Sequence, residues 1–228
     1  MENFNKRRLT DLNNTISKCK VCERLYSFRN EIATRKRKMY NKEIYWGKPV
    51  SGFGDLNAKI LIIGLAPAAH GGNRTGRVFT GDKSSDFLFK CLGKVGLSNQ
   101  NYSVNKDDGL KLINAYLTLS LKCVPPEDKP TKQELLNCSQ YLKEEFLILK
   151  NVRVIIALGK VAFDSIVLFY KNNFFFKKKI NFEHGKIINL PDKKKLVACY
   201  HPSPRNVNTG RINIFQFTKL FQDTIDLV

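Results

Sequence analysis

Four short, almost entirely apolar segments limit most strongly what this sequence can fold into. They are Lys59–Leu65, Tyr116–Cys123, Val152–Leu158 and Lys195–Tyr200. Near-continuous apolar runs of this length are typical of strands that are covered on both faces, as in a parallel sheet. No apolar run approaches the roughly 20 residues that span a bilayer, so we expect no membrane partner.

Helical patterns separate these segments. Ser84–Val95 begins with serines and has apolar residues at three- and four-residue spacing, and Thr131–Leu149 opens with the capping-box pattern TKQE. Lys160–Tyr170 and Phe215–Leu227 are the other two helical segments. Strands that alternate with helices predict an α/β fold, a three-layer α/β/α sandwich with a central, mainly parallel four-stranded sheet. The length suits a single domain, residues 1–228.

Polar loops follow three of the predicted strands. They are Ala66–Asp82, Val124–Pro130 and His201–Arg211, and all three are rich in glycine or proline. In open α/β sheets, ligands bind outside the carboxyl ends of the strands. We therefore expect the functional site at this edge. A fourth segment, Lys171–Lys195, is basic and aromatic, and we predict an inserted hairpin or excursion there.

The chain carries a net charge of +19, and this charge is unevenly placed. Residues 1–50 hold 13 Lys and Arg against 5 acids, and residues 171–211 hold 10 against 2. Basic patches of this kind favour a polyphosphate partner. Charge alone leaves solubility, a lysine-rich composition, RNA and an anionic membrane surface open. The first residues lack the apolar stretch of a secretory signal, so we expect a cytoplasmic protein, and we expect a monomer.

Six cysteines in such a chain argue against a disulfide framework. Cys19 and Cys22 form a C-x2-C pair in a predicted basic N-terminal helical region, residues 1–50. Cys123 and Cys138 are separated by 14 residues, with the first at a strand's end and the second two turns into a helix. Four thiolates suit either tetrahedral zinc or a [4Fe–4S] cluster, and the spacing does not choose between them.

Further alternatives remain for the cysteines. All six could be unrelated buried thiols, and Cys91 and Cys199 are predicted to be so because they lie in apolar stretches. If the other four bind a metal, they leave no open coordination position, so the metal has a structural role and pins residues 1–50 to the core.

The loop Gly64–Asp82 contains five glycines in 19 residues, which lets backbone N–H groups approach a ligand closely. It matches neither a P-loop nor a dinucleotide fingerprint. Its functional side chains are His70, Asn73, Arg74, Arg77, Phe79 and Asp82. An aromatic ring between cations, with a carboxylate three residues on, is suited to stacking a planar base and stabilising positive charge.

The loop His201–Arg211 reads HPSPRNVNTGR and follows the last predicted strand. A lone histidine is usually structural, but this one lies at a strand's exit beside two prolines that stiffen the backbone. We expect the polar and basic side chains of the loop to hold phosphates, and these are Ser203, Arg205, Asn206, Asn208, Thr209 and Arg211.

The two loops resemble the active-site motifs of the uracil-DNA glycosylase superfamily, specifically its family-five (type B) branch. The stretch YWGKPVSGFGD, Tyr45–Asp55, and the four cysteines resemble that branch too, so the similarity extends from about Cys19 to the last predicted helix. The resemblance implies a DNA repair hydrolase that excises uracil from DNA and leaves an abasic site. It also implies a [4Fe–4S] cluster as cofactor, held by Cys19, Cys22, Cys123 and Cys138.

The resemblance implies roles for individual residues as well. Asp82 and His201 would be catalytic: His201 donates a hydrogen bond to the departing base, and ionised Asp82 stabilises the sugar cation or positions water. The flipped base would be bound by Gly64, Ala66, Ala68, His70, Phe79 and Ser120, with Phe79 stacking on it. DNA would be bound by Asn73, Arg74, Arg77, Ser203, Arg205, Asn206, Asn208 and Arg211.

Two departures from the wider superfamily affect the expected chemistry. Ala68 and Ala69 occupy the stretch where a water-activating Asp or Asn usually stands, which gives Asp82 more weight. Leu119 and Ser120 stand where iron–sulfur relatives often carry an asparagine that reads the edge of uracil. We therefore expect relaxed selectivity, with excision of other deaminated bases such as hypoxanthine.

Three other functions compete with this interpretation. A non-enzymatic zinc module that binds nucleic acid accounts for the charge and the four cysteines, but not for the two loops. An iron–sulfur electron carrier fits poorly, because ferredoxin ligands cluster closely in sequence. A metal-dependent nucleotide hydrolase would use His70, Asp82 and His201.

Overall fold

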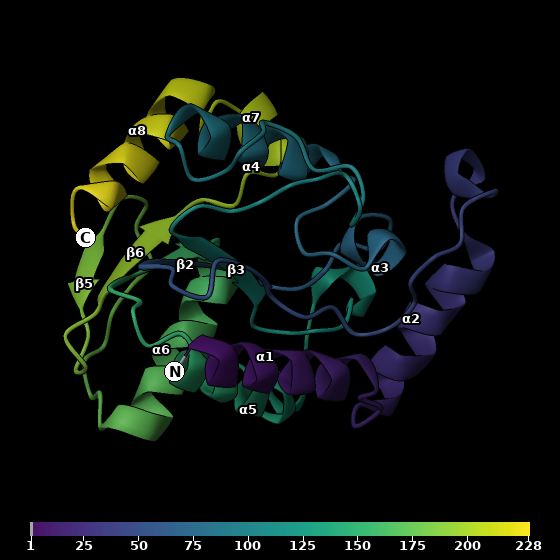
Figure 1. The fold of residues 1–228 in the computed structure, drawn as a ribbon, viewed down its shortest axis with the longest axis horizontal. Coiled ribbons are helices and arrows are strands. Elements are labelled where there is room, and N and C mark those ends of the chain that lie inside the picture. The colour runs from purple at the N-terminus through teal and green to yellow at the C-terminus, as the bar shows by residue number, and fades with distance from the viewer. Residues whose placement is uncertain (1) are drawn as a thin grey trace.

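The computed structural model describes residues 2–228 and places a six-stranded sheet at the centre of the molecule (Figure 1). The strand order is β1-β3-β2-β4-β6-β5. The strands are β1 (Phe53–Gly54), β2 (Ile60–Gly64), β3 (Ala115–Leu119), β4 (Val154–Leu158), β5 (Ile187–Asn189) and β6 (Lys195–Cys199). The four inner strands are parallel, and the two outer ones are antiparallel to their neighbours.

The four inner strands are the four that the sequence predicts. Almost every residue in them is buried, which explains why their sequences are continuously apolar rather than alternating. The count of four strands was too low, because β1 and β5 have only two and three residues. Edge strands this short carry no periodic pattern that a sequence could reveal. The segment Lys171–Lys195 was predicted to be a hairpin or excursion. It contributes the end of a helix, an irregular stretch and β5, and β5 forms an antiparallel hairpin with β6.

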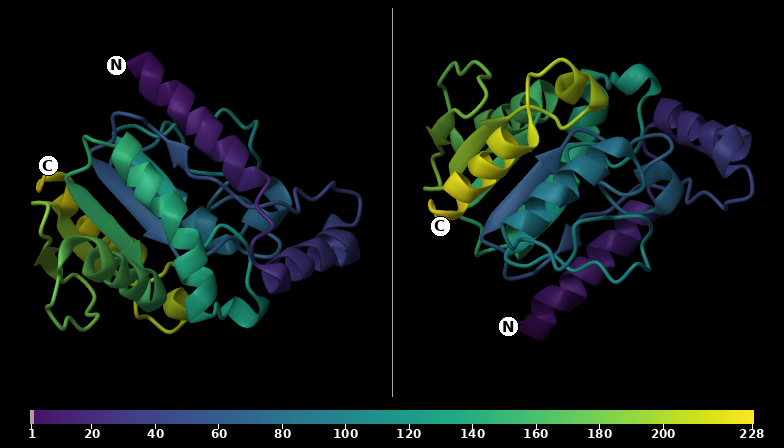
Figure 2. Two further views of the ribbon diagram at one scale, coloured as in Figure 1. Left: turned by 90° about the horizontal axis from the view of Figure 1, so that it is seen from below. Right: turned by 90° about the horizontal axis from the view of Figure 1, so that it is seen from above.

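Helices cover both faces of the sheet, as the three-layer prediction requires (Figures 1 and 2). One face carries α4 (Lys83–Lys94) and α8 (Ile214–Ile225), and the other carries α5 (Lys132–Ile148) and α6 (Lys160–Phe174). Alternate strand residues separate the two cores. Ile60 and Ile62 pack with Phe89 and Phe217 on the first face, whereas Leu61 and Ile63 pack with Phe163 on the second.

The helices begin where the sequence indicates. Thr131 caps α5 in a capping box with Glu134, and Asp82 caps α4 in a capping box with Ser85. Gly159 has a φ of +96° and connects β4 directly to α6. These three helices are therefore fixed at their first residues, which also fixes the ends of the loops that precede them.

The N-terminal region consists of α1 (Glu2–Ser17), α2 (Glu23–Arg35) and the short 3-10 helix η1 (Lys38–Tyr40). Helix α1 packs on α5, and α2 lies beside α3 (Gly72–Thr75) at the carboxyl end of the sheet (Figures 1 and 2). No helix within residues 2–228 is long and apolar enough to span a bilayer.

Candidate active site

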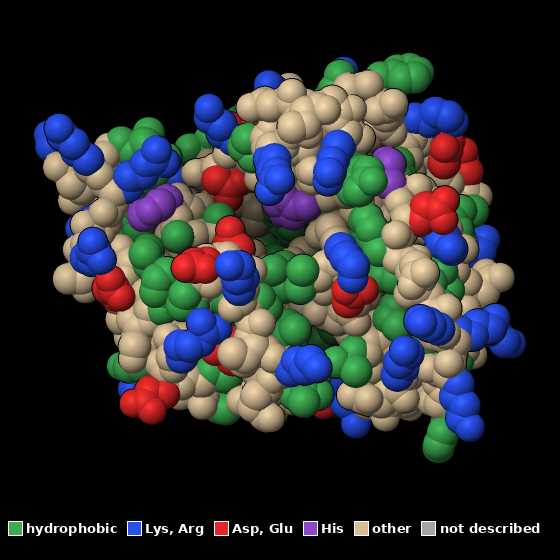
Figure 3. Space-filling view, turned by 180° about the vertical axis from the view of Figure 1, so that it is seen from behind, with side chains coloured by type: hydrophobic (Ala, Val, Ile, Leu, Met, Phe, Trp, Pro, Cys, Tyr) green, Lys and Arg blue, Asp and Glu red, His purple; other side chains and the backbone are tan. Residues whose placement is uncertain are grey.

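The two predicted loops both emerge at the carboxyl edge of the sheet. Gly64–Asp82 continues from β2 and contains α3, whereas His201–Arg211 continues from β6 and contains α7 (Pro204–Asn208). Only β4 separates β2 from β6, so the loops face each other across one strand. Figure 3 shows a hollow in the middle of one face of the molecule, with a histidine side chain at its rim and Lys and Arg side chains around it.

Phe79 of the first loop and His201 of the second loop lie next to each other. Their ring centroids are 6.3 Å apart and their planes are inclined at 31°. Phe79 has a φ of +45°, and its ring lies so close to Gly64 that a Cβ on that glycine would be 2.6 Å from Phe79 Cζ. The same Cβ would lie 3.0 Å from Leu119 Cδ2. Gly64 therefore leaves the space in which the predicted stacking residue packs beside the predicted catalytic histidine.

Hydrogen bonds hold the backbone of His201 in place, whereas its ring nitrogens form none within residues 2–228. Its carbonyl accepts hydrogen bonds from the backbone N–H of Ser203 (2.8 Å) and from Asn206 Nδ2 (2.8 Å). Within residues 2–228 no side-chain hydrogen bond involves the ring nitrogens, which leaves them available to a ligand. Burial lowers the pKa of His201 from 6.5 to about 4, so the imidazole is neutral at pH 7.

Asp82 is the N-cap of α4. Its Oδ1 accepts a hydrogen bond from the backbone N–H of Ser85 (2.9 Å). Its Oδ2 faces Gly71: a Cβ on Gly71 would be 2.1 Å from this oxygen and 3.2 Å from the Cβ of Ala68. Burial raises the pKa of Asp82, and hydrogen bonds from the first amides of the helix oppose that shift. The carboxylate thus reaches the surroundings of Ala68, where the sequence lacks an acidic side chain.

The other predicted base-binding residues of the first loop differ in their surroundings. Ala68 is exposed, whereas Ala66 is half-buried against the cluster of side chains that surrounds the cysteines. His70 is half-buried, and its Nδ1 forms a hydrogen bond with the Tyr45 hydroxyl (3.0 Å). Burial, and then two neighbouring arginines, lower the pKa of His70. Their contact with a base stays a prediction.

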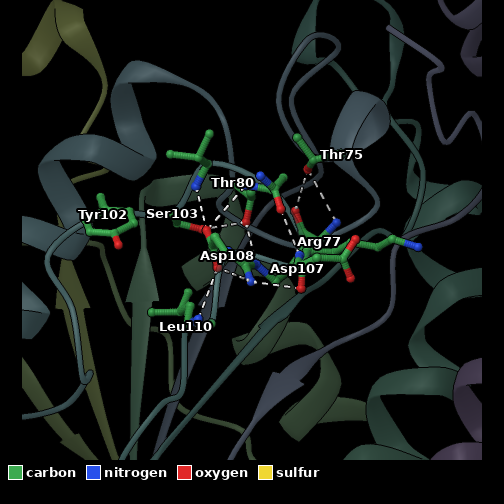
Figure 4. A network of polar contacts seen from close by, with 12 residues as sticks. Thr75, Arg77, Thr80, Tyr102, Ser103, Asp107, Asp108 and Leu110 are labelled. Atoms are coloured by element: carbon green, nitrogen blue, oxygen red, sulfur yellow. Dashed lines mark hydrogen bonds and ion pairs between the residues drawn. The ribbon is translucent and has the colours of Figure 1, made fainter.

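Arg77 was predicted to bind DNA, but its side chain is 5% exposed and lies inside a polar network (Figure 4). Its guanidinium donates to both carboxylate oxygens of Asp108 (2.9 and 2.7 Å), to Ser103 Oγ (2.8 Å) and to Thr80 Oγ1 (3.0 Å). Burial acts to raise the pKa of Asp108, but hydrogen bonds from Arg77 and two backbone amides lower it to about 2. This geometry favours a structural role for Arg77 over phosphate contact.

Arg74 and Asn73 are also buried rather than presented to solvent. Arg74 donates from Nε to the carbonyl of His70 (2.7 Å) and from Nη2 to the carbonyl of Gly81 (2.8 Å), and it pairs with Glu43. It therefore ties the middle of the first loop, at His70, to its end, at Gly81. Asn73 has no exposed surface. Both residues were predicted to bind DNA because they belong to a polar loop, and their burial has no signature in the local sequence.

The second loop divides its predicted DNA-binding residues into two groups. Ser203 caps α7 by accepting from the backbone N–H of Asn206, whose own side chain is bound to His201. Arg205, Asn208 and Arg211 are exposed on α7 and just beyond it. The exposed group fits the predicted phosphate contacts, whereas the first group maintains the shape of the loop.

Ser120 lies in a different position from the one its predicted role requires. Its side chain is 3% exposed and lines a pocket with α5 and α6 residues, among them Leu142 and Phe169. Leu119, one residue earlier, points to the opposite face and packs in the same cluster as Phe79. Successive residues of a strand point to opposite faces, so only one of the two can face the base pocket. The geometry favours Leu119.

The four predicted ligand cysteines line one pocket. Cys138 lies two turns into α5, as predicted, and Cys123 follows β3 by four residues. The first pair was wrongly placed within a helix, because Cys19 and Cys22 lie in the turn between α1 and α2, with Cys22 as the N-cap of α2. Cys91 and Cys199 are fully buried in the core, as predicted.

Hydrogen-bond donors surround the sulfur atoms. Arg29 Nη1 donates to Cys123 Sγ (3.1 Å), and the backbone N–H of Lys122 donates to Cys138 Sγ (3.3 Å). Burial raises the pKa of the Cys123 thiol to about 11 and that of Cys138 to about 12. A bound metal would displace these protons, since a coordinating thiol is deprotonated.

Two residues beside the cysteines were missed by the sequence interpretation. Arg29 is 3% exposed, and Lys122 is 1% exposed. Lys122 Nζ pairs with Glu145 (2.9 Å) and donates to Thr118 Oγ1 (2.6 Å). Basic residues are normally exposed, so residue type alone does not distinguish these two from the surface charge. For Lys122, its position next to Cys123 is a signal that could have been used.

The glycine-rich loop and the His-Pro-Ser-Pro loop therefore lie at one edge of a mainly parallel sheet. Residues 51–225 match the family model of the uracil DNA glycosylase superfamily, and the chain belongs to this superfamily.

Relatives identify the branch of the superfamily. The chain is 44% identical over 204 residues to the type-5 uracil-DNA glycosylase of Pyrobaculum aerophilum, covering 90% of this chain and 86% of that protein. It is 42% identical over 210 residues to the type-5 enzyme of Thermus thermophilus, covering 92% and 93%. The type-4 uracil-DNA glycosylase of Archaeoglobus fulgidus is 26% identical over 155 residues, or 68% and 70%. The predicted family-five branch and the predicted class of enzyme, a DNA glycosylase, are confirmed.

Proposed function

We propose that this chain hydrolyses the N-glycosidic bond of uracil and of other deaminated bases, such as hypoxanthine, in DNA. Uracil-DNA glycosylase activity follows from its family. The wider range of bases and the residue roles are our proposal. The observation that carries it is that Phe79 packs against His201 while the carboxylate of Asp82, in the same loop as Phe79, faces Gly71.

Access to the bond requires that the nucleotide leave the helix, because a stacked base shields its sugar. Arg205, Asn208 and Arg211 are exposed beside His201 and are suited to hold the flanking phosphates. Once the base is extruded, Phe79 stacks on it, a contact worth roughly 1–3 kcal/mol.

Bond cleavage separates a cation-like sugar from an anionic base. His201 is neutral at pH 7, and its single ring N–H donates to the base oxygen as negative charge builds there. Asp82 supplies the opposite charge, and it stabilises the sugar cation or orients the attacking water. Its position beside Ala68 supports this role, because the loop carries no other carboxylate.

The breadth of substrates depends on the wall of the base pocket. Leu119 packs beside Gly64 and Phe79, and it offers no hydrogen bond to the edge of a base. Ser120, the polar neighbour, lines a pocket with α5 and α6 instead. An apolar wall has no polar group to be left unpaired, so this side of the pocket discriminates weakly between bases of different hydrogen-bonding pattern.

Excision is tested with single-lesion oligonucleotides that contain uracil or hypoxanthine, treated with alkali after incubation. We expect strand cleavage at both lesions and none at undamaged thymine. Cleavage at uracil alone would reject the broad range and leave the family activity intact. Cleavage at neither lesion would reject the proposed function.

The four cysteines fit a [4Fe–4S] cluster better than a zinc ion. In tetrahedral zinc sites the sulfur atoms lie about 3.8 Å apart. Within residues 2–228 no three Cys, His, Asp or Glu side chains are grouped closely enough to hold one metal ion, although all four cysteines line one pocket. A four-iron cluster is larger and holds its ligands further apart.

We therefore propose that Cys19, Cys22, Cys123 and Cys138 bind a [4Fe–4S] cluster. When bound, the cluster supplies a cross-link between the turn after α1, the loop after β3 and helix α5. The donors from Arg29 and Lys122 stabilise the thiolates. Iron and acid-labile sulfide analysis tests the assignment, and a stoichiometric zinc content without iron would reject it. The cytoplasmic location and the monomeric state stay predictions.

A further inference from the structure

Arg29 lies between the cysteine pocket and the catalytic loop. It belongs to α2, and its side chain is 3% exposed. Nη1 donates to Cys123 Sγ (3.1 Å), and Nη2 donates to the carbonyl of Cys19 (3.0 Å). One guanidinium therefore contacts both cysteine pairs, which are about a hundred residues apart in the sequence.

The backbone of the same residue holds the catalytic loop. Asn73 Nδ2 donates to the Arg29 carbonyl (3.3 Å). Asn73 lies in α3, in the middle of Gly64–Asp82, and it is fully buried. Its own carbonyl accepts from the backbone N–H of Gly47 (3.0 Å). The position of α2 thus constrains the short helix between the predicted base-binding and catalytic residues.

The charge of Arg29 needs a partner near the cysteines. Among the residues that the structure describes, no carboxylate lies within ion-pairing distance of its guanidinium. Its other close contact is the ring of Tyr26, whose centroid is 5.0 Å from Arg29 Cζ. A buried cation without a counter-charge is costly, so the negative charge of ligated thiolates is what keeps this side chain in place.

We propose that Arg29 is a positioning residue that couples the ligation of the cysteine site to the geometry of the catalytic loop. Thiolate charge fixes the guanidinium, the guanidinium fixes α2, and the Arg29 carbonyl fixes Asn73 and the loop that carries Phe79 and Asp82. The coupling rests on the proposed cluster, and its failure can be told apart from the failure of that proposal.

The experiment is amide hydrogen exchange on the full-length protein, with the visible absorbance of the cluster recorded on each sample. We compare Arg29→Gln with Arg24→Gln. Arg24 lies on the same helix and pairs with Glu134, and within residues 2–228 it forms no hydrogen bond with a cysteine sulfur or with Asn73. We expect residues 70–82 to exchange about tenfold faster in R29Q than in R24Q, with kcat reduced more than KM is raised.

A second variant keeps the test informative if R29Q loses its cluster or fails to fold. Asn73→Ala removes the link on the loop side only, so we expect normal visible absorbance together with faster exchange of residues 70–82. Removing the cluster should accelerate this exchange in the wild type and add little in N73A.

Two results would overturn the inference. Unchanged exchange of residues 70–82 in both R29Q and N73A, with the cluster present, would show that no coupling exists. Equal acceleration after cluster removal in the wild type and N73A would show that the loop responds by another route. A wild type without visible absorbance would instead reject the cluster itself, and with it the coupling.

Discussion

The carboxylate of Asp82 stands directly against the backbone of Gly71. A single added carbon on that glycine would lie 2.1 Å from Asp82 Oδ2. The other oxygen of the same carboxylate caps α4 through Ser85. Asp82 therefore has two separable functions, the stabilisation of a helix and the placement of charge beside Ala68.

Asp82→Asn should separate these two functions. Asparagine is as good an N-cap as aspartate, so we expect the free energy of unfolding to change by a few tenths of a kcal/mol. The loss of negative charge should reduce single-turnover excision by roughly 10²–10⁴-fold. DNA affinity, measured by fluorescence anisotropy, should be nearly unchanged. Full activity of D82N would remove Asp82 from the mechanism.

Gly71→Ala tests the placement of the carboxylate without changing it chemically. The new methyl group must displace Asp82 or α3, at an overpacking cost of roughly 1–3 kcal/mol. We expect excision to fall by at least about tenfold, since small misplacements of catalytic groups are costly. Gly93→Ala, at the far end of α4, is the matched control and should retain activity. Equal activities of the two variants would contradict the tight contact.

The free energy of unfolding should decrease as the pH is lowered below neutrality, because His201 binds a proton more readily in the unfolded state. The unfolded imidazole titrates near 6.5 and the folded one at about 4, so the unfolded state binds more protons between these values. Stability is therefore full above pH 6.5 and is lost as pH falls toward 4. Between pH 7 and 5 this loss amounts to roughly 2 kcal/mol.

His201→Gln should lack this part of the pH dependence. Urea unfolding of wild type and variant at pH 7 and pH 5 measures the difference. Asp108 does not interfere, because its lowered pKa affects stability only below 3.8. Parallel losses in the two proteins would show that His201 is not held neutral.

Removing the charge of Arg77 should affect the stability of the fold, whereas removing the charge of Arg205 should affect DNA binding. Arg77→Met leaves Asp108 buried without its partner and should destabilise the fold by roughly 3–5 kcal/mol. Arg205→Gln should leave the melting temperature unchanged and reduce the salt dependence of DNA binding by about one phosphate contact. If the Arg77→Met variant were stable and bound DNA more weakly, the result would support the DNA contact that the sequence predicts for Arg77.

Cys123→Ser should remove the visible absorbance of the proposed cluster and loosen the packing of α2 against the loop after β3. Cys91→Ser is the control, because Cys91 lies on the buried face of α4 and does not line the pocket of the other four cysteines. It should be destabilised while keeping its iron. Iron retained in C123S at the wild-type ratio would exclude Cys123 as a ligand.

Local pattern was enough to predict much of this molecule. Continuous apolar runs specified β2, β3, β4 and β6, because a strand buried on both faces has to be apolar throughout. Capping residues marked the start of α5, and the position of polar loops after strands indicated the functional edge. The two edge strands could not be foreseen, since strands of two or three residues have no periodicity.

Burial and the direction of side chains were decided only by the tertiary structure. The sequence offered Arg74, Arg77 and Ser120 as ligand contacts, but long-range partners such as Asp108 and the alternation of β3 turned them inward or away. The sequence placed Asp82 and His201 in separate loops, and the parallel strands brought those loops together. The spacing of the four cysteines predicts that they bind a metal. Only the packing of α2 places Arg29 between these cysteines and Asn73. Contacts between residues far apart in the chain depend on topology, which no local pattern encodes.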